Sequence, residues 1–233
     1  MFLYHMHPFL QEKKLAYRII VVEQSFGESF NRATLFNIGF LHSQKYSNFD
    51  CYMFHDIDYL PNNLHNSYAC EKSPISPGRC IIKRNGELWF KWHYSWGGVF
   101  AANKSSFEAV NGMSNLYFGW GWEDTDLGTR FRHVFKKIPN PDCRYKHIRT
   151  STMVSSRPAA CLICTAVQRM YVDGLNSLKY HLMEVVEESL YTVVRVEIKQ
   201  KDYRYPPCTE ADRVCSWTKK NWKSRYFIKI HDD

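Results

Sequence analysis

Two aspartates one residue apart, Asp56 and Asp58, follow directly on the apolar run 51–54. The run predicts a buried strand that ends at Asp58, and because side chains alternate along a strand, the two carboxylates should leave its tip in different directions. One carboxylate can then bind a divalent cation together with phosphate oxygens, while the other accepts a hydrogen bond from a sugar. This pattern suits a nucleotide diphosphate sugar, although Asp-x-Asp at a strand end also occurs as a simple solvated turn.

A second acidic cluster, formed by Glu123, Asp124 and Asp126, follows a run of glycines and tryptophans over residues 119–122. Glycines let the backbone approach a ligand closely, and tryptophan faces are platforms for sugars. An adjacent carboxylate can take a proton from a sugar hydroxyl. The alternative is the first turn of a helix, whose dipole favours acidic residues, and both interpretations can hold together.

Length and composition favour one globular domain. The 233 residues are 45% hydrophobic and 16% aromatic, which is enough to bury a substantial core. We expect a catalytic domain over residues 1–200 and a basic, cysteine-containing extension over 201–233. No apolar run reaches the roughly 18–20 residues of a membrane span, and residues 1–10 lack the features of a signal peptide. We therefore expect no membrane span in this chain.

The formal net charge of +8 raises the question of nucleic-acid binding. Lys and Arg are dispersed over most of the chain, with a denser cluster only near its end. No DNA- or RNA-binding motif accompanies them. The charge is better suited to attracting nucleotide-sugar phosphates or anionic membranes, and nucleic acid is not an expected partner.

The order of apolar segments predicts alternating strands and helices, and hence an α/β fold. We expect a buried strand over 15–22, a helix over 32–44, and a late strand over 191–198. Ser105 or Ser106 would cap a short helix that Asn111 and Gly112 terminate. In open α/β sheets, ligands lie beyond the carboxyl ends of the strands, which is where the two aspartates are placed.

Six short motifs occur in the order and near the spacing of one known family. They are Phe30-Asn31-Arg32-Ala33, Asp56-Ile57-Asp58, Gly97-Gly98-Val99, Val110-Asn111-Gly112, Gly119-Trp120-Gly121 and Asp173-Gly174-Leu175-Asn176-Ser177-Leu178. Over roughly residues 4–198 the chain resembles the beta-1,4-galactosyltransferases, including their N-acetylgalactosaminyltransferase members. The resemblance implies a glycosyltransferase A-type fold, with a mixed central sheet flanked by helices, and location in the Golgi lumen.

The resemblance also implies roles for individual residues. Asp124 would be the catalytic base, with Glu123 contacting the donor sugar beside it. Donor-binding residues would be Phe30, Arg32, Asp56, Ser95, Gly98 and Trp120, and acceptor-binding residues Trp92, Trp120, Asp124 and Thr125. The reaction would be an inverting transfer of galactose or N-acetylgalactosamine from UDP to a terminal sugar, GlcNAc, of a glycoprotein or glycolipid.

The metal site implied by the resemblance contains Asp58 and conventionally holds manganese. Family members complete it with a Met and a His three residues apart, whereas the corresponding positions here are His147 and Thr150. An imidazole in place of a thioether makes the site harder and would also admit other divalent ions. Near the acidic cluster, Thr125 replaces a carboxylate and residues 151–169 depart from the family, which leaves the acceptor open.

A further departure bears on the donor sugar. Ser95 stands where galactose-specific members carry a bulky Tyr that crowds the 2-position of the sugar. A small residue there leaves room for an N-acetyl group, so UDP-GalNAc competes with UDP-galactose as the expected donor. Alternatively, Trp92, Tyr94 or Trp96 fills the same space.

Family members also have an arginine-bearing first strand, and this chain begins just after the point where that strand should end. We therefore expect the fold to lack it. This keeps a second hypothesis open, namely a truncated, non-catalytic relative that binds sugar or a partner.

The eight cysteines bear on the cellular compartment. The resemblance implies a disulfide between Cys51 and Cys70, on either side of the aspartates, and hence an oxidising compartment. The glycosylation sequon that begins at Asn103 points the same way. The pair Cys161 and Cys164 and the pair Cys208 and Cys215 suggest disulfides or free thiols, with zinc as the alternative.

Overall fold

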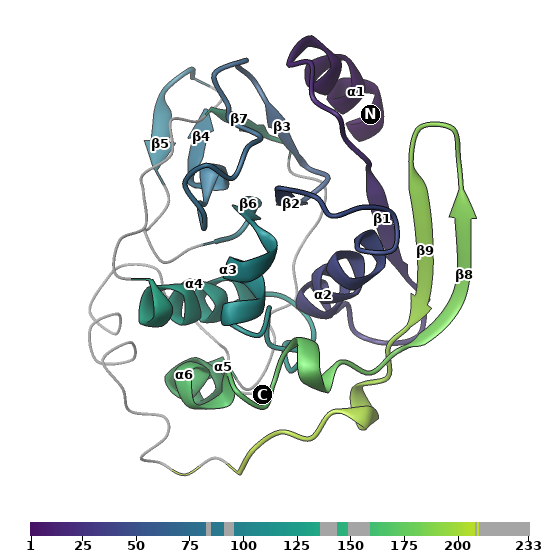
Figure 1. Cartoon of the computed structure of the whole chain (residues 1–233). Coiled ribbons are helices and arrows are strands. Elements are labelled where there is room, and N and C mark those ends of the chain that lie inside the picture. The colour runs from purple at the N-terminus through teal and green to yellow at the C-terminus, as the bar shows by residue number, and fades with distance from the viewer. Residues whose placement is uncertain (83–84, 91–95, 136–143, 149–158, 208, 210–233) are drawn as a thin grey trace.

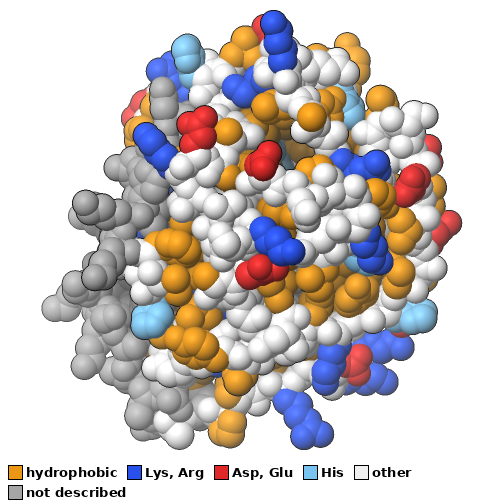
Figure 2. All heavy atoms as spheres, viewed as in Figure 1, with side chains coloured by type: hydrophobic (Ala, Val, Ile, Leu, Met, Phe, Trp, Pro, Cys, Tyr) orange, Lys and Arg blue, Asp and Glu red, His pale blue; other side chains and the backbone are white. Residues whose placement is uncertain are grey.

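The computed structural model describes residues 1–82, 85–90, 96–135, 144–148, 159–207 and 209. These residues fold into β-sheets, two of them mixed, that are flanked by helices (Figure 1). Within these ranges, no helix has the length and apolar character needed to cross a bilayer. On the face shown in Figure 2, Lys and Arg side chains emerge at several separate places between acidic and apolar ones.

The order of elements alternates between strands and helices, as the sequence predicted. The helices are α1 (Phe2–Glu12), α2 (Arg32–Ser43), α3 (Lys104–Ala109), α4 (Glu123–Val134), α5 (Ala159–Cys164) and α6 (Ala166–Arg169). The strands are β1 (Ile20–Gln24), β2 (Tyr52–His55), β3 (Tyr59–Pro61), β4 (Cys80–Ile82), β5 (Leu88–Phe90), β6 (Val99–Ala102), β7 (Tyr145–His147), β8 (His181–Glu187) and β9 (Thr192–Glu197).

The described strands form three sheets instead of one continuous central sheet. Their orders are β1-β9-β8, β2-β6 and β3-β7-β4-β5. Two of them are mixed. In the first, β9 is parallel to β1 and antiparallel to β8. In the third, β7 is parallel to β4 and antiparallel to β3. In Figure 1, α2 lies below β1 and β2, and α4 and α6 lie below the ribbon β2-β6.

The first strand is shorter than its apolar pattern suggested. It was expected over 15–22 but begins at Ile20, because hydrogen-bonded pairing with β9 starts only there, at Thr192. Leu15 and Tyr17 instead pack, partly buried, against the cluster that contains α1. The late strand, expected over 191–198, is confirmed as β9.

The helix expected over 32–44 is confirmed as α2, and its capping residue is Asn31, whose side chain accepts a hydrogen bond from the backbone N of Thr34 at 3.0 Å. The short helix after β6 is also present, but its cap was wrongly assigned to Ser105 or Ser106. Asn103 caps α3 by accepting from the backbone N of Ser106.

The two aspartates do not stand at the tip of one strand that ends at Asp58. Strand β2 ends at His55, and Asp56 and Asp58 belong to the tight connection that leads into β3. The chain turns here, and the backbone N of Tyr59 donates to the carbonyl O of Asp56 at 3.2 Å. The two carboxylates do take different partners, but strand alternation is not the reason, because residues i and i+2 of a strand share a face and here both aspartates lie outside the strand.

An apolar cluster that includes Phe54, near the end of β2, lies where β2, β6 and α3 meet. The ring of Phe54 stacks on that of Phe100, with centroids 4.4 Å apart, and is tilted against that of Phe107, with centroids 4.5 Å apart. Leu127 and Phe131 of α4 pack in the same cluster. This packing fixes the first turn of α4 relative to the end of β2.

A large cavity of about 3240 Å³ lies between β1 and β2. Residues of both strands and of α2 line it, and β1 and β2 belong to different sheets. At the other end of the domain, Tyr203 packs against Phe118, so the packed unit includes residues past the boundary expected at residue 200. Most of 201–233 lies outside the described residues.

Candidate functional site

Asp56 ties three segments of the chain together. Its Oδ1 accepts from Nε of Arg32 at 2.6 Å, and its Oδ2 accepts from the backbone N of Gly98 at 3.1 Å. Arg32 is the first residue of α2, and Gly98 immediately precedes β6. The side chain of Asp56 remains 26% exposed, which leaves the carboxylate within reach of a ligand in the cavity.

Gly98 permits this close approach. Its φ is +90°, and a Cβ built there would lie 2.4 Å from the ring of Tyr59. Any side chain would therefore clash with Tyr59 or strain the backbone. Glycine at position 98 is thus required on steric grounds, independently of any ligand.

Arg32 also faces the second acidic cluster, where its Nη1 lies 3.5 Å from Oε1 of Glu123. Burial, and then the charge of Asp124, raise the pKa of Glu123 to about 7, although Arg32 opposes the shift. Nη2 of Arg32 and Oε2 of Glu123 are buried without a hydrogen-bond partner among the described residues. Each of these buried groups carries a free-energy cost that a polar partner would remove.

Asp58 meets His147 on the other side of the connection. The pairing of Tyr59 with His147 between β3 and β7 brings Nε2 of His147 to 3.0 Å from Oδ2 of Asp58. The sequence placed these two residues in one metal site, and the structure brings them together. Among the described residues, no group of three or more His, Cys, Asp and Glu side chains surrounds a point where a metal could bind. Thr150 lies outside the described residues.

This pair fits a divalent cation chemically. A carboxylate oxygen and an imidazole nitrogen that face each other are ligands of manganese and related ions. Two protein ligands leave coordination positions for the oxygens of a diphosphate. The donor set therefore fits the metal that the sequence implied.

The segment 119–122 links the acidic cluster to α2. The backbone N of Gly119 donates to the carbonyl O of Phe30 at 2.8 Å. Trp122, the residue before α4, has a φ of +75°, an uncommon conformation for a non-glycine residue that concentrates at functional sites. Trp120 and Phe30 are 47% and 56% exposed, so both rings present faces to a ligand.

Asp124 lies in the first turn of α4, beside Glu123. A Cβ on Gly97 would lie 2.9 Å from Oδ2 of Asp124, so this carboxylate rests directly against the backbone before β6. Oγ1 of Thr125 lies 3.3 Å from Oδ1 of Asp124 and donates to it. The acidic cluster therefore both begins helix α4 and lines the candidate site, as the two interpretations of the sequence allowed.

The predicted residues converge on one cavity. Its lining includes Phe30, Arg32, Asp56, Asp58, Gly98, Trp120, Glu123, Asp124, Thr125 and His147. Ser95 and Trp92, predicted for the donor and the acceptor, lie outside the described residues. Trp96, one of the residues expected to compete for the same space as Ser95, is instead buried against Phe131.

Sequence reasoning missed a buried network of charges behind the site. Asp126 accepts from Nε of Arg130 at 2.7 Å and from Nη2 of Arg169 at 2.5 Å, and both arginines also contact Asp173. The network joins α4 to α6 and to the segment that follows it. It holds the helix whose first turn carries Glu123 and Asp124.

The disulfide between Cys51 and Cys70 is confirmed. It closes the loop that contains both Asp56 and Asp58, and such closure stabilises mainly by restricting the unfolded chain. Cys161 and Cys164 are each engaged in a disulfide and neither is a free thiol, so the zinc alternative for these two cysteines is wrong. Cys208 and Cys215 lie outside the described residues.

Two family models match the chain. Residues 1–71 match the N-terminal region of glycosyl transferase group 7, and residues 85–153 match the model described as the N-terminal domain of galactosyltransferase. The two matches together include the aspartate pair, the acidic cluster and His147.

Curated relatives and solved structures agree with these models. The chain is 38% identical to beta-1,4-galactosyltransferase 4 of Cricetulus griseus over 83% of its length, and 37% identical to beta-1,4-galactosyltransferase 1 of Bos taurus over 84%. It spans 57% and 50% of these relatives' lengths.

The structural similarity is to Drosophila beta-1,4-galactosyltransferase 7. A mutant of that protein in complex with manganese, UDP-Gal and xylobiose aligns with a TM-score of 0.69 and 26% identity, covering 85% of this chain and 87% of the other. A complex of its catalytic domain with xylobiose aligns equally well, at 25% identity. The fold is thus the glycosyltransferase A type.

Proposed function

Because the chain belongs to the beta-1,4-galactosyltransferase family, we propose that it is a metal-dependent inverting glycosyltransferase that uses a UDP-sugar. It transfers galactose or N-acetylgalactosamine in beta-1,4 linkage to a terminal GlcNAc of a glycoprotein or glycolipid. The observation that carries the proposal is the convergence of Arg32, Asp56, Asp58, Glu123 and Asp124 on one cavity.

The donor would bind where the two acidic clusters meet. Phe30 offers an exposed ring to the uracil, and Arg32, the first residue of α2, lines the same cavity. Asp56 accepts hydrogen bonds from the ribose and the sugar through its exposed edge. Arg32 and Glu123 line the same cavity beside Asp56, so a donor bound there would lie against all three side chains.

Asp58 and His147 would hold the metal ion, manganese or another divalent cation. When bound, the ion supplies positive charge that stabilises the leaving diphosphate. The relative from Drosophila was crystallised with manganese and UDP-Gal together, which supports this assignment.

Asp124 acts as the general base. It takes the proton of an acceptor hydroxyl while that oxygen attacks the anomeric carbon of the donor sugar. The new glycosidic C–O bond forms on the face opposite the breaking bond, and UDP leaves with the electron pair of that bond. Glu123 holds the sugar beside it, and Trp120 covers the sugar with its exposed ring. Thr125 steadies Asp124 by donating a hydrogen bond.

The compartment that suits this chemistry is the Golgi lumen. The Cys51–Cys70 disulfide supports an oxidising environment, since such bonds rarely persist in the cytosol. The proposed partners are a UDP-sugar and a glycan acceptor, without nucleic acid.

Replacing Asp58 with asparagine should remove a charged metal ligand while preserving the side chain's shape. We expect manganese-dependent UDP binding, measured by isothermal titration calorimetry, to be lost, because a neutral amide is a poor ligand for a hard cation. UDP binding without metal should stay unchanged. Asp202→Asn, an exposed aspartate that does not line the cavity, is the matched control and should bind as the unaltered protein does. Equal manganese dependence in both variants would contradict the assignment.

Transfer from UDP-galactose and UDP-GalNAc to a GlcNAc-terminated acceptor tests the function itself. We expect manganese-dependent product with both donors, and we expect Ser95→Tyr to lower the ratio of GalNAc to galactose transfer because its ring would meet the N-acetyl group. The ratio cancels any general loss of activity. An unchanged ratio would contradict the donor argument alone. UDP binding without transfer to any of several terminal sugars, xylobiose included, would favour a non-catalytic relative.

A further inference from the structure

The sequon Asn103-Lys104-Ser105 is the only Asn-x-Ser/Thr sequence in the 233 residues. It spans the end of β6 and the start of α3. The proposed transfer reaction makes no use of these residues. We propose that Asn103 is an N-glycosylation site and carries an N-linked oligosaccharide in the native protein.

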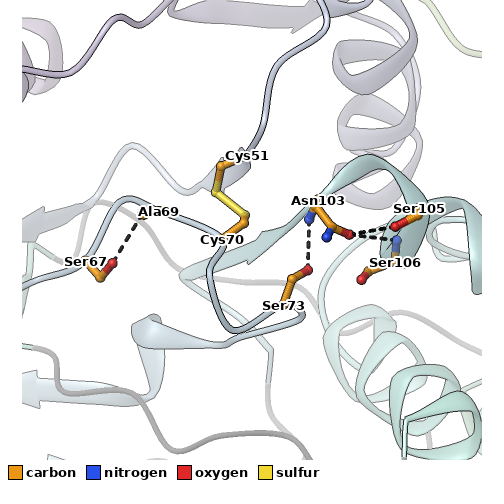
Figure 3. The surroundings of a disulfide bond; sticks show 8 residues. All are labelled: Cys51, Ser67, Ala69, Cys70, Ser73, Asn103, Ser105 and Ser106. Carbon is orange, nitrogen blue, oxygen red and sulfur yellow. Dashed lines mark hydrogen bonds between the residues drawn. A yellow bond between two sulfur atoms is a disulfide. The ribbon is translucent and has the colours of Figure 1, made fainter.

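In the side-chain amide of Asn103, the oxygen accepts the capping hydrogen bonds and the nitrogen is the atom that a glycan would modify. Oδ1 of Asn103 accepts from the backbone N of Ser106 at 2.9 Å and from Oγ of Ser105 at 3.1 Å, as Figure 3 shows. These bonds cap α3 and engage the hydroxyl that completes the sequon. A glycan attaches to the amide nitrogen and not to the oxygen, so both bonds survive the modification.

The amide nitrogen, Nδ2, is available for attachment. It donates no hydrogen bond within the described part of the chain, and it is not among the buried atoms left without a partner there, so solvent reaches it. The next two residues, Lys104 and Ser105, are exposed. A sugar on Nδ2 therefore displaces no internal contact.

The modification follows a defined chemistry. Nδ2 attacks the anomeric carbon of an oligosaccharide carried on a lipid diphosphate, and an N–C bond forms. The bond from that carbon to the diphosphate breaks, the lipid diphosphate leaves with the electron pair, and one amide proton passes to a base of the transferring enzyme. The lipid-linked donor is the co-reactant, and it is supplied in the secretory pathway.

The position of the sequon places the glycan away from the reacting groups. In the antiparallel ribbon β2-β6, Tyr52 pairs with Ala102 and His55 pairs with Val99. One end of the ribbon therefore carries Asp56 and Gly98, and the other carries Cys51 and Asn103. At about 3.3 Å per residue, the five steps from Gly98 to Asn103 separate the two ends by roughly 16 Å. The disulfide at the sequon's end of the ribbon forms in the same oxidising pathway that glycosylates proteins.

The test is secretion of the full chain, fused to a cleavable signal sequence, from cultured eukaryotic cells. We expect a glycosylated species that peptide-N-glycosidase converts to one of lower mass with aspartate at position 103. Ser105→Ala should abolish the modification, and so should Asn103→Asp, which keeps a good helix cap. Ser106→Ala, outside the sequon, should remain fully glycosylated.

An unmodified Asn103 in protein that has entered the secretory pathway, judged by formation of the Cys51–Cys70 disulfide, would overturn the proposal. So would a glycan that persists in Ser105→Ala. Both readouts are masses and do not depend on transferase activity, so failure of the proposed function leaves this test intact.

Discussion

Replacing Asp126 with alanine is expected to lower the free energy of unfolding by about 3–5 kcal/mol, the usual cost of removing one partner of a buried ion pair. Asp126 is completely buried. Its carboxylate forms ion pairs with Arg130 and Arg169 and accepts a hydrogen bond from the hydroxyl of Tyr117 at 3.0 Å. Its loss leaves two buried guanidinium groups with only Asp173 to balance them. Urea denaturation monitored by circular dichroism measures the change.

The matched control is Glu108→Ala. Glu108 also belongs to an i,i+4 ion pair on a helix, with Lys104 at 3.9 Å, but both side chains are nearly half exposed. We expect that substitution to change the free energy of unfolding by less than about 1 kcal/mol. A loss at Asp126 no larger than the loss at Glu108 would show that the buried network contributes little to stability.

Asp124→Asn is expected to slow sugar transfer by about 10²-fold or more, the range that a positioned general base contributes. The substitution preserves size and most hydrogen bonding, including acceptance from Thr125, but removes basicity. Binding of the UDP-sugar should therefore survive. Transfer rate and donor affinity, measured separately by product formation and calorimetry, distinguish a base from a residue that only holds the ligand.

Glu108→Gln, an exposed change of the same kind, serves as the control and should leave the rate unaltered. If donor affinity falls in Asp124→Asn as much as the rate does, Asp124 is a binding residue. If neither quantity changes, the acidic cluster does not supply the base, and the assignment is wrong.

The elements that could be predicted are those whose local pattern agrees with their packing. Helix α2 combines an Asn cap with a buried apolar face, and α4 begins at the acidic residues that its dipole favours. The meeting of Asp58 and His147 was predicted through the register of the resemblance, and no local pattern would have found it. The structure supplies the physical link, which is the pairing of β3 with β7.

The details that were missed depend on tertiary partners. Asn and Ser are both good helix caps, so the sequence could not decide between Asn103 and the serines after it. Asp126 and Arg130, four residues apart, have the spacing of an ordinary exposed helix pair. In the structure both are fully buried and pair with Arg169 and Asp173, which belong to a distant segment. The length of β1 was likewise decided by where β9 begins to pair with it.

The two ends of the β2-β6 ribbon differ, and this difference has a practical consequence for immobilising the protein. A resin, surface or fluorescent label coupled through a sugar on Asn103 would hold the molecule by the end of the ribbon that carries the Cys51–Cys70 disulfide. The opposite end, with Asp56 and Gly98, would face the bulk solution. Coupling through lysines offers no such control, because Lys and Arg emerge at several separate places on the surface (Figure 2). A single attachment point at the covalently closed end would therefore orient every molecule alike.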